Sequence, residues 1–151
     1  MSDFTAQDTR AHDTGVHDSS AQDALVMLMV MVSASDRAMK DEELAKIGQI
    51  VSSFPVFSGY SHDRLVATSE TASLALSEEG GLDAVVKAIA EAIPERLRDT
   101  AYACGVEVAA ADLSLRQEEL RVLQMLRDAF GLDKLTVAAL ERSAMARYRG
   151  V

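Results

Sequence analysis

A fourteen-residue pattern occurs twice in the chain and constrains its fold more than any other feature. Residues 34–47 read ASDRAMKDEELAKI and residues 110–123 read AADLSLRQEELRVL. The two copies share the same residue at matching positions, namely Ala34/Ala110, Asp36/Asp112, Glu42/Glu118, Glu43/Glu119 and Leu44/Leu120. Each copy is typical of a helix that ends near the Asp, a short loop, and a second helix that starts just before the Glu pair. A helix–loop–helix unit that occurs twice predicts a pseudo-symmetric bundle.

Apolar residues recur at the helical period from about residue 22 onward. The clearest stripe has the spacing i, i+3, i+4, i+7 and i+11, and consists of Leu82, Val85, Val86, Ile89 and Ile93. Nowhere do β-branched residues alternate long enough to predict a strand. We therefore expect an all-α fold, a compact bundle of about seven helices with an internal pseudo-repeat. The expected helices are residues 22–36, 40–53, 61–78, 82–92, 94–111, 115–130 and 134–147.

The N-terminal segment differs in composition from the rest of the chain. An aspartate stands at every fifth position from Asp3 to Asp23, among many Ser and Thr residues and few large apolar ones. We expect residues 1–21 to form a disordered acidic tail and residues 22–151 to form one helical domain. The alternative is a tail that binds metal weakly through His12 and His17, although a flexible segment does not preform a metal site.

The formal net charge of −9 narrows the range of partners. Such a charge repels phosphate backbones and anionic membranes, so we expect no binding to nucleic acid. The longest apolar run, residues 24–32, has roughly half the length that a bilayer span needs. We expect no signal peptide, because the first residues show no positively charged region followed by an apolar core. We expect a cytoplasmic protein with no direct membrane insertion, whose favoured partners are cations or a basic protein surface.

Helical spacing assigns the two glutamates of each repeated pair to different faces. Glu43 and Glu119 each head the apolar, core-facing stripe of their helix. Glu42 and Glu118 point about 100° further round, toward solvent. A carboxylate on the core face needs a partner, because burying it unpaired costs several kcal/mol.

Two interpretations of these carboxylates stay open from the sequence. In the first, each core-facing glutamate accepts a hydrogen bond from a free backbone N–H of the first helical turn, and the motif only locks the helices. In the second, Asp and Glu oxygens of the two units hold a divalent cation, because hard cations such as calcium and magnesium prefer oxygen ligands. The spacing is not that of an EF-hand, since Ala38 and Lys40 occupy positions where that loop needs ligands.

Residues suited to catalysis are sparse. Cys104 lies on an apolar helical stripe and is expected to be a buried small hydrophobe. His62, beside Asp63 at a predicted helix start, has no Ser or Cys placed to use it as a base. Glu107 stands between two valines, and we expect it to pair with an arginine; the alternative is a fifth acidic ligand. We therefore expect a protein that is not an enzyme.

The sequence resembles a known family, the tellurite-resistance TerB family. The resemblance rests on the doubled Ala-x-Asp pattern followed by an acidic pair, and on the stretches 97–103, 106–112, 118–120, 132–133 and 141–142. It covers about residues 22–147. It implies an all-helical fold of about seven helices with a pseudo-repeat, an acidic surface proposed to bind a divalent metal, and a link to tellurium-oxyanion and general stress resistance.

The chain departs from that family at one point of the motif. Family members often carry Gly directly after each motif Asp, whereas this chain carries Arg37 and Leu113. The change removes easy access to positive φ at the turn. Arg37 also places a competing cation beside Asp36.

The residue pattern favours a non-enzymatic protein that binds a divalent cation, and the resemblance implies a role in stress and tellurite resistance. The candidate cations are calcium, magnesium or zinc, and the candidate ligands are Asp36, Glu42, Glu43, Asp112, Glu118 and Glu119. Protein partners from a stress-resistance system are expected, and a homodimer is left open. The alternative is a structural interaction module whose carboxylates only cap and lock helices. A third reading, an enzyme acting on tellurite or another oxyanion, lacks nucleophile and cofactor signatures.

Overall fold

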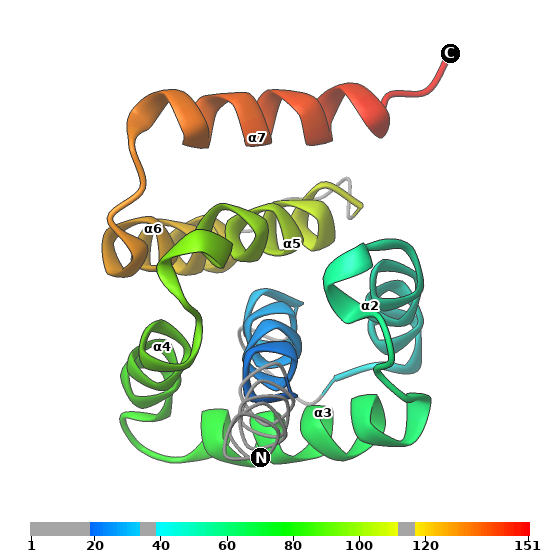
Figure 1. Cartoon of the computed structure of the whole chain (residues 1–151), viewed down its shortest axis with the longest axis vertical. Helices are drawn as coiled ribbons and strands as arrows, with labels where there is room; N and C mark the ends of the chain where they lie inside the picture. Colours follow the sequence, from blue (N-terminus) through cyan, green and yellow to red (C-terminus); the bar gives the residue numbers. More distant parts are fainter. Residues whose placement is uncertain (1–18, 34–38, 112–116) are drawn as a thin grey trace, which may run out of the picture.

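The structure, a computed structural model, describes residues 19–33, 39–111 and 117–151. These ranges contain seven α-helices and no strand, which confirms the all-α prediction (Figure 1). The described part of the first helix spans residues 19–33 and is called the N-terminal helix below. The others are α2 (Asp41–Ser53), α3 (His62–Ser77), α4 (Gly81–Ala92), α5 (Arg98–Ala111), α6 (Gln117–Phe130) and α7 (Lys134–Arg147), with 3-10 turns η1 (Pro55–Phe57) and η2 (Glu95–Leu97).

The sequence prediction of the helices is confirmed with one instructive difference. A single helix was expected from residue 94 to residue 111, whereas Glu95–Leu97 forms a 3-10 turn and the α-helix begins at Arg98. Pro94 explains the difference, because its extended backbone (ψ 152°) caps the short turn instead of entering the α-helix. The geometric relation between the two repeat units stays a prediction, since residues 34–38 and 112–116 lie outside the described ranges, as does most of the expected N-terminal tail.

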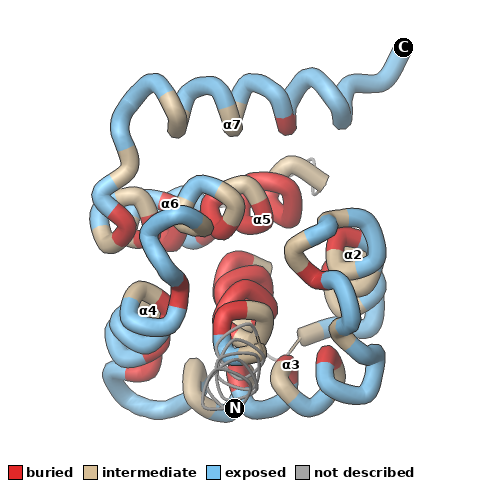
Figure 2. Tube along the Cα trace, viewed as in Figure 1, coloured by how far each residue is buried: buried red, intermediate tan, exposed pale blue. Residues whose placement is uncertain are grey.

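The N-terminal helix forms the centre of the molecule. Most of its residues from 24 to 32 are buried, and those with no exposed surface are Leu25, Val26, Leu28, Met29, Val30, Met31 and Val32. In the view of Figures 1 and 2, α2, α3, α4 and α5 surround it. A helix that is apolar on all sides must be covered on all sides. The run of apolar residues that is too short for a membrane span therefore forms the core of the bundle.

Polar side chains fix this central helix to α3 and to the segment that joins α2 and α3. Arg64 donates to both carboxylate oxygens of Asp23, at 2.9 and 2.7 Å, and the Tyr60 hydroxyl donates to Asp23 at 2.8 Å. The Arg64 guanidinium holds the pKa of the Asp23 carboxyl below its usual range. Gln22 adds hydrogen bonds from its amide to the backbone carbonyls of Val56 and Ser58. These contacts orient the helix, which apolar packing alone does not specify.

The break between α3 and α4 depends on two glycines, Gly80 and Gly81. Gly80 has a φ of +71°, a conformation that L residues rarely adopt. A Cβ at Gly81 would lie 2.2 Å from the carbonyl oxygen of Ala75, so α4 approaches the end of α3 more closely than any side chain allows. The pair lets the chain reverse direction within a short segment.

Candidate functional site

The first acidic pair begins α2, and its two side chains face different ways, as predicted. Glu42 is exposed and Glu43 is partly buried. The backbone N–H of Lys40 donates to the Glu43 carboxylate at 3.1 Å. This N–H has no acceptor within the helix, so Glu43 supplies one half of a capping box. The Lys40 side chain has no acceptor atom and cannot supply the other half. In this unit the structure favours the helix-lock interpretation.

The second acidic pair begins α6, where the two faces differ more strongly. Glu118 is exposed, whereas Glu119 is only 5% exposed. Helical spacing therefore identified the buried carboxylate correctly. Glu119 lies in the first turn of α6, where the helix dipole favours a negative charge.

The two predicted aspartate ligands, Asp36 and Asp112, lie outside the described residues. Within the described residues, no three His, Cys, Asp or Glu side chains lie close enough to hold a metal ion together. Among the described residues, the predicted glutamates therefore form no metal-binding cluster. The carboxylate oxygens of these glutamates are ligands that hard cations prefer. A complete site would also need Asp36 and Asp112.

Lys46 links the helix of the first unit to the entrance of the second. The helix α2 packs against α5, and Lys46 Nζ donates to the backbone carbonyl of Ala111 over 3.5 Å. Ala111 is the last described residue before Asp112. Glu42 precedes Lys46 by one helical turn and lies on the same face of α2. The face of α2 that carries Glu42 is therefore directed toward the end of α5 at which the second loop begins.

Glu107 has the structural partner that the sequence analysis expected. It is 8% exposed, its carboxylate forms an ion pair with Arg147, and the Tyr148 hydroxyl donates to it at 2.8 Å. The alternative role as a fifth acidic ligand has no support in this geometry. Cys104, one turn earlier on α5, has no exposed surface. Burial and the nearby Glu107 charge raise the pKa of its thiol to about 12, so it is a core residue and a poor nucleophile.

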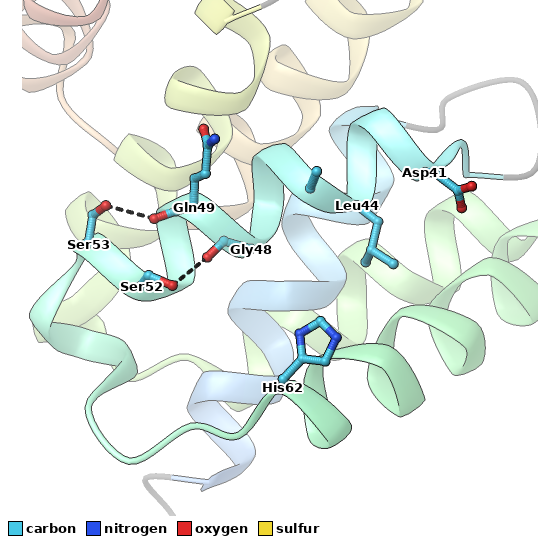
Figure 3. A pocket seen from close by; sticks show the side chains of 8 residues that line it. Asp41, Leu44, Gly48, Gln49, Ser52, Ser53 and His62 are labelled. Carbon is cyan, nitrogen blue, oxygen red and sulfur yellow. Dashed lines mark hydrogen bonds between the residues drawn. The ribbon is translucent and has the colours of Figure 1, made fainter.

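His62 lines a shallow groove between α2 and the start of α3 (Figure 3). The hydroxyl of Ser61 caps α3 by accepting from the backbone N–H of Arg64. Across the groove, Ser52 and Ser53 donate to backbone carbonyls one turn earlier, at 2.9 and 2.7 Å. Both hydroxyls are thus engaged with their own helix. The groove offers no activated nucleophile beside His62.

A partly buried polar network that sequence reasoning missed joins α5, α6 and α7. The Tyr102 hydroxyl donates to Glu141 at 2.6 Å, and Arg127 donates to Tyr102 at 3.2 Å and to Glu141 at 2.8 Å. Tyr102 has no exposed surface. Burial and the Glu141 carboxylate raise the pKa of Tyr102 above its usual range. The one sequence signal for this network is Tyr102 itself, a polar side chain within the apolar pattern of residues 101–108. Its partners lie in other helices, so helical spacing does not identify them.

Comparison with protein families decides what this bundle is. The family model described as tellurite resistance protein TerB matches residues 22–142. The chain belongs to the TerB family. The match runs from the N-terminal helix into α7, so the TerB region contains both acidic pairs and all members of the Tyr102 network. No curated protein and no solved structure gives a significant match.

The TerB assignment confirms the resemblance seen in the sequence and associates the chain with tellurite resistance. Membrane insertion was not expected. In the described ranges, every helix is too short or too polar to cross a bilayer.

Proposed function

We propose that this TerB protein is a non-enzymatic tellurite-resistance and stress protein that binds a divalent cation, which stabilises its folded state. The ligands would be the carboxylates of its two units: Asp36, Glu42, Glu43, Asp112, Glu118 and Glu119. The observation that carries the proposal is the contact of Lys46 with Ala111. It directs the helix of one acidic pair toward the loop of the other.

The second unit is the stronger of the two candidate sites. Glu119 is a carboxylate held on the core face in the first turn of α6, seven residues after Asp112. Glu118 adds an exposed carboxylate next to it in the sequence. Oxygen donors of this kind bind calcium or magnesium, and zinc binds carboxylates less often than Cys or His. A bound cation would fix the α5–α6 loop against α2 and so shape a surface for protein partners.

The test is thermal unfolding of the full chain after chelator treatment, with calcium, magnesium, manganese or zinc added singly. A site filled to 100 times its dissociation constant stabilises the folded state by about 2.7 kcal/mol. A chain of this length then gains several degrees in Tm. The key variant is Asp112→Asn with Glu118→Gln, which leaves the buried Glu119 in place. The matched control is Glu70→Gln with Glu91→Gln, which removes the same charge from exposed helical positions.

A cation that raises the Tm of the wild type and the control, but not that of the Asp112/Glu118 variant, supports the proposal and names the metal. Equal shifts in the variant and the control would refute it, because binding would then reflect the overall charge of −9.

The helix-lock function is the second candidate, and the hydrogen bond from Lys40 N–H to Glu43 favours it. It predicts no Tm gain with any cation, while Glu43→Ala, which removes the acceptor of the Lys40 N–H, lowers the Tm in metal-free buffer by loss of a cap worth about 1 kcal/mol. In that case the two units serve only to hold an interaction module together.

A further inference from the structure

A half-enclosed cleft of about 470 Å³ lies between α7 on one side and α5 and α6 on the other. Figure 1 shows α7 crossing above α5 and α6, and Figure 2 shows that most of α7 is exposed. The walls of the cleft are mainly apolar and include Val106, Ala109, Leu123, Leu120 and Met145. Leu120 and Met145 are each about half exposed, at 49% and 48%. A cleft of this size and lining is typical of sites for small apolar ligands, which fill about 300–1,000 Å³.

The polar groups of the cleft are, with one exception, engaged by other side chains. Arg127 and Glu141 bind each other and Tyr102. The Tyr148 hydroxyl donates to Glu107. Arg149 lines the same cleft, is exposed, and has no ion pair among the described residues. The positively charged side chain of Arg149 therefore lies beside the apolar wall of the cleft without an ion-pair partner among the described residues.

This local charge is opposite to that of the chain as a whole. The charged side chains lining the cleft are Arg127, Arg149 and Glu141, and the ion pair cancels the first against the last. The cleft therefore carries one net positive charge in a protein of net charge −9. An apolar ligand with a negative head group complements both the wall and the cation, whereas a cationic ligand would meet Arg149.

We propose that the cleft between α5, α6 and α7 binds a free single-chain carboxylate amphiphile, with its alkyl chain against Leu123 and Met145 and its carboxylate at Arg149. This function is independent of the proposed cation site, which lies at the acidic pairs. Each further methylene buried in the cleft tightens binding about fourfold until the chain outgrows it. The exposed pairing with Arg149 contributes about fivefold.

The experiment uses the full chain labelled with ¹³C at the methionine methyl groups and titrated with octanoate, decanoate and dodecanoate below their micelle concentrations. Met145 reports on the cleft, and Met31, fully buried in the N-terminal helix, reports on the core. Met145→Leu assigns the reporter signal. Arg149→Gln removes the cation, and Arg142→Gln removes the same charge from the same region but outside the cleft lining. Both side chains are exposed, so both variants retain the fold.

The expected result is a saturable shift of the Met145 signal with Met31 unmoved, an affinity that rises with chain length, and a loss of about fivefold in Arg149→Gln but not in Arg142→Gln. Dodecylammonium should bind more weakly than dodecanoate. The proposal is overturned if the ammonium binds equally well, if both arginine variants behave alike, or if Met31 moves with Met145. A Met145 shift that follows protein concentration alone, with a dimer in sedimentation, would instead assign the cleft to a second copy of the chain.

Discussion

Replacing Tyr102 by phenylalanine tests whether the α5–α6–α7 network stabilises the fold. The substitution keeps the buried ring and removes the hydroxyl, which donates to Glu141 at 2.6 Å and accepts from Arg127 at 3.2 Å. A hydrogen bond to a charged group contributes about 1.5–3 kcal/mol. The side chains of Glu141 and Arg127 are 37% and 27% exposed, so water replaces part of the lost interaction. We expect a loss of about 1–2 kcal/mol, or roughly 3–6 °C in Tm.

The pH dependence of the same variant gives an independent readout. The pKa of Tyr102 is raised in the folded protein. Its contribution to stability is therefore fully present below about pH 10, the pKa of an unfolded tyrosine, and is lost as the pH rises toward the folded pKa. Urea unfolding between pH 8 and pH 11 should show this loss in the wild type and a smaller one in Tyr102→Phe.

The matched control is Tyr148→Phe, which removes a single hydrogen bond, to Glu107, from a residue that is 36% exposed. It should cost less than half as much as Tyr102→Phe. Equal losses in the two variants, or the same alkaline destabilisation in Tyr102→Phe and the wild type, would refute the view that the network holds α7 in place.

Three further predictions concern the core and its turns. Asp23→Asn should destabilise the protein at pH 7 but hardly at pH 2, because a lowered pKa gives stability that is lost as the pH falls through it; urea midpoints at both pH values check this. Cys104 should resist a thiol reagent in the native protein and react at once in urea, since the thiol is buried and its pKa is about 12; fast native labelling would contradict the burial. Gly81→Ala should lower the Tm because its Cβ would lie 2.2 Å from the Ala75 carbonyl oxygen. Gly48→Ala, in α2, would place a Cβ in ordinary contact with Leu65 at 3.8 Å and should raise stability by about 0.5–1 kcal/mol; equal effects by calorimetry would refute the clash.

The helices and their faces were readable from the sequence because both follow from local spacing. The 3.6-residue period placed Glu119 in the core and Glu118 in solvent, and the structure confirms both. It also placed Cys104 in the core. The 3-10 turn before α5 was missed, because a proline at residue 94 suits the first turn of an α-helix as well as the cap of a shorter turn.

The polar networks could not be predicted, because their members meet only through tertiary packing. Arg147 is 40 residues from Glu107, and Arg64 is 41 from Asp23. Neither pair has a helical spacing that would suggest contact. The sequence predicted that Glu107 pairs with an arginine, but which arginine it is depends on the position of α7 in the fold. For the cation site, Asp36 and Asp112 lie outside the described residues, so the assembly of the two units stays a prediction.

The central position of the N-terminal helix has a consequence for how the chain is made. Synthesis proceeds from the N-terminus, so residues 24–32 leave the ribosome before any of the helices that cover them exist. Until α5 has been made, this apolar stretch has no complete surface to pack on, and it is available for association with other nascent chains. The last described helix, α7, packs mainly against α5. A chain stopped before α7 therefore encloses its most apolar segment, whereas one stopped before α5 leaves that segment uncovered and is the form most prone to aggregate.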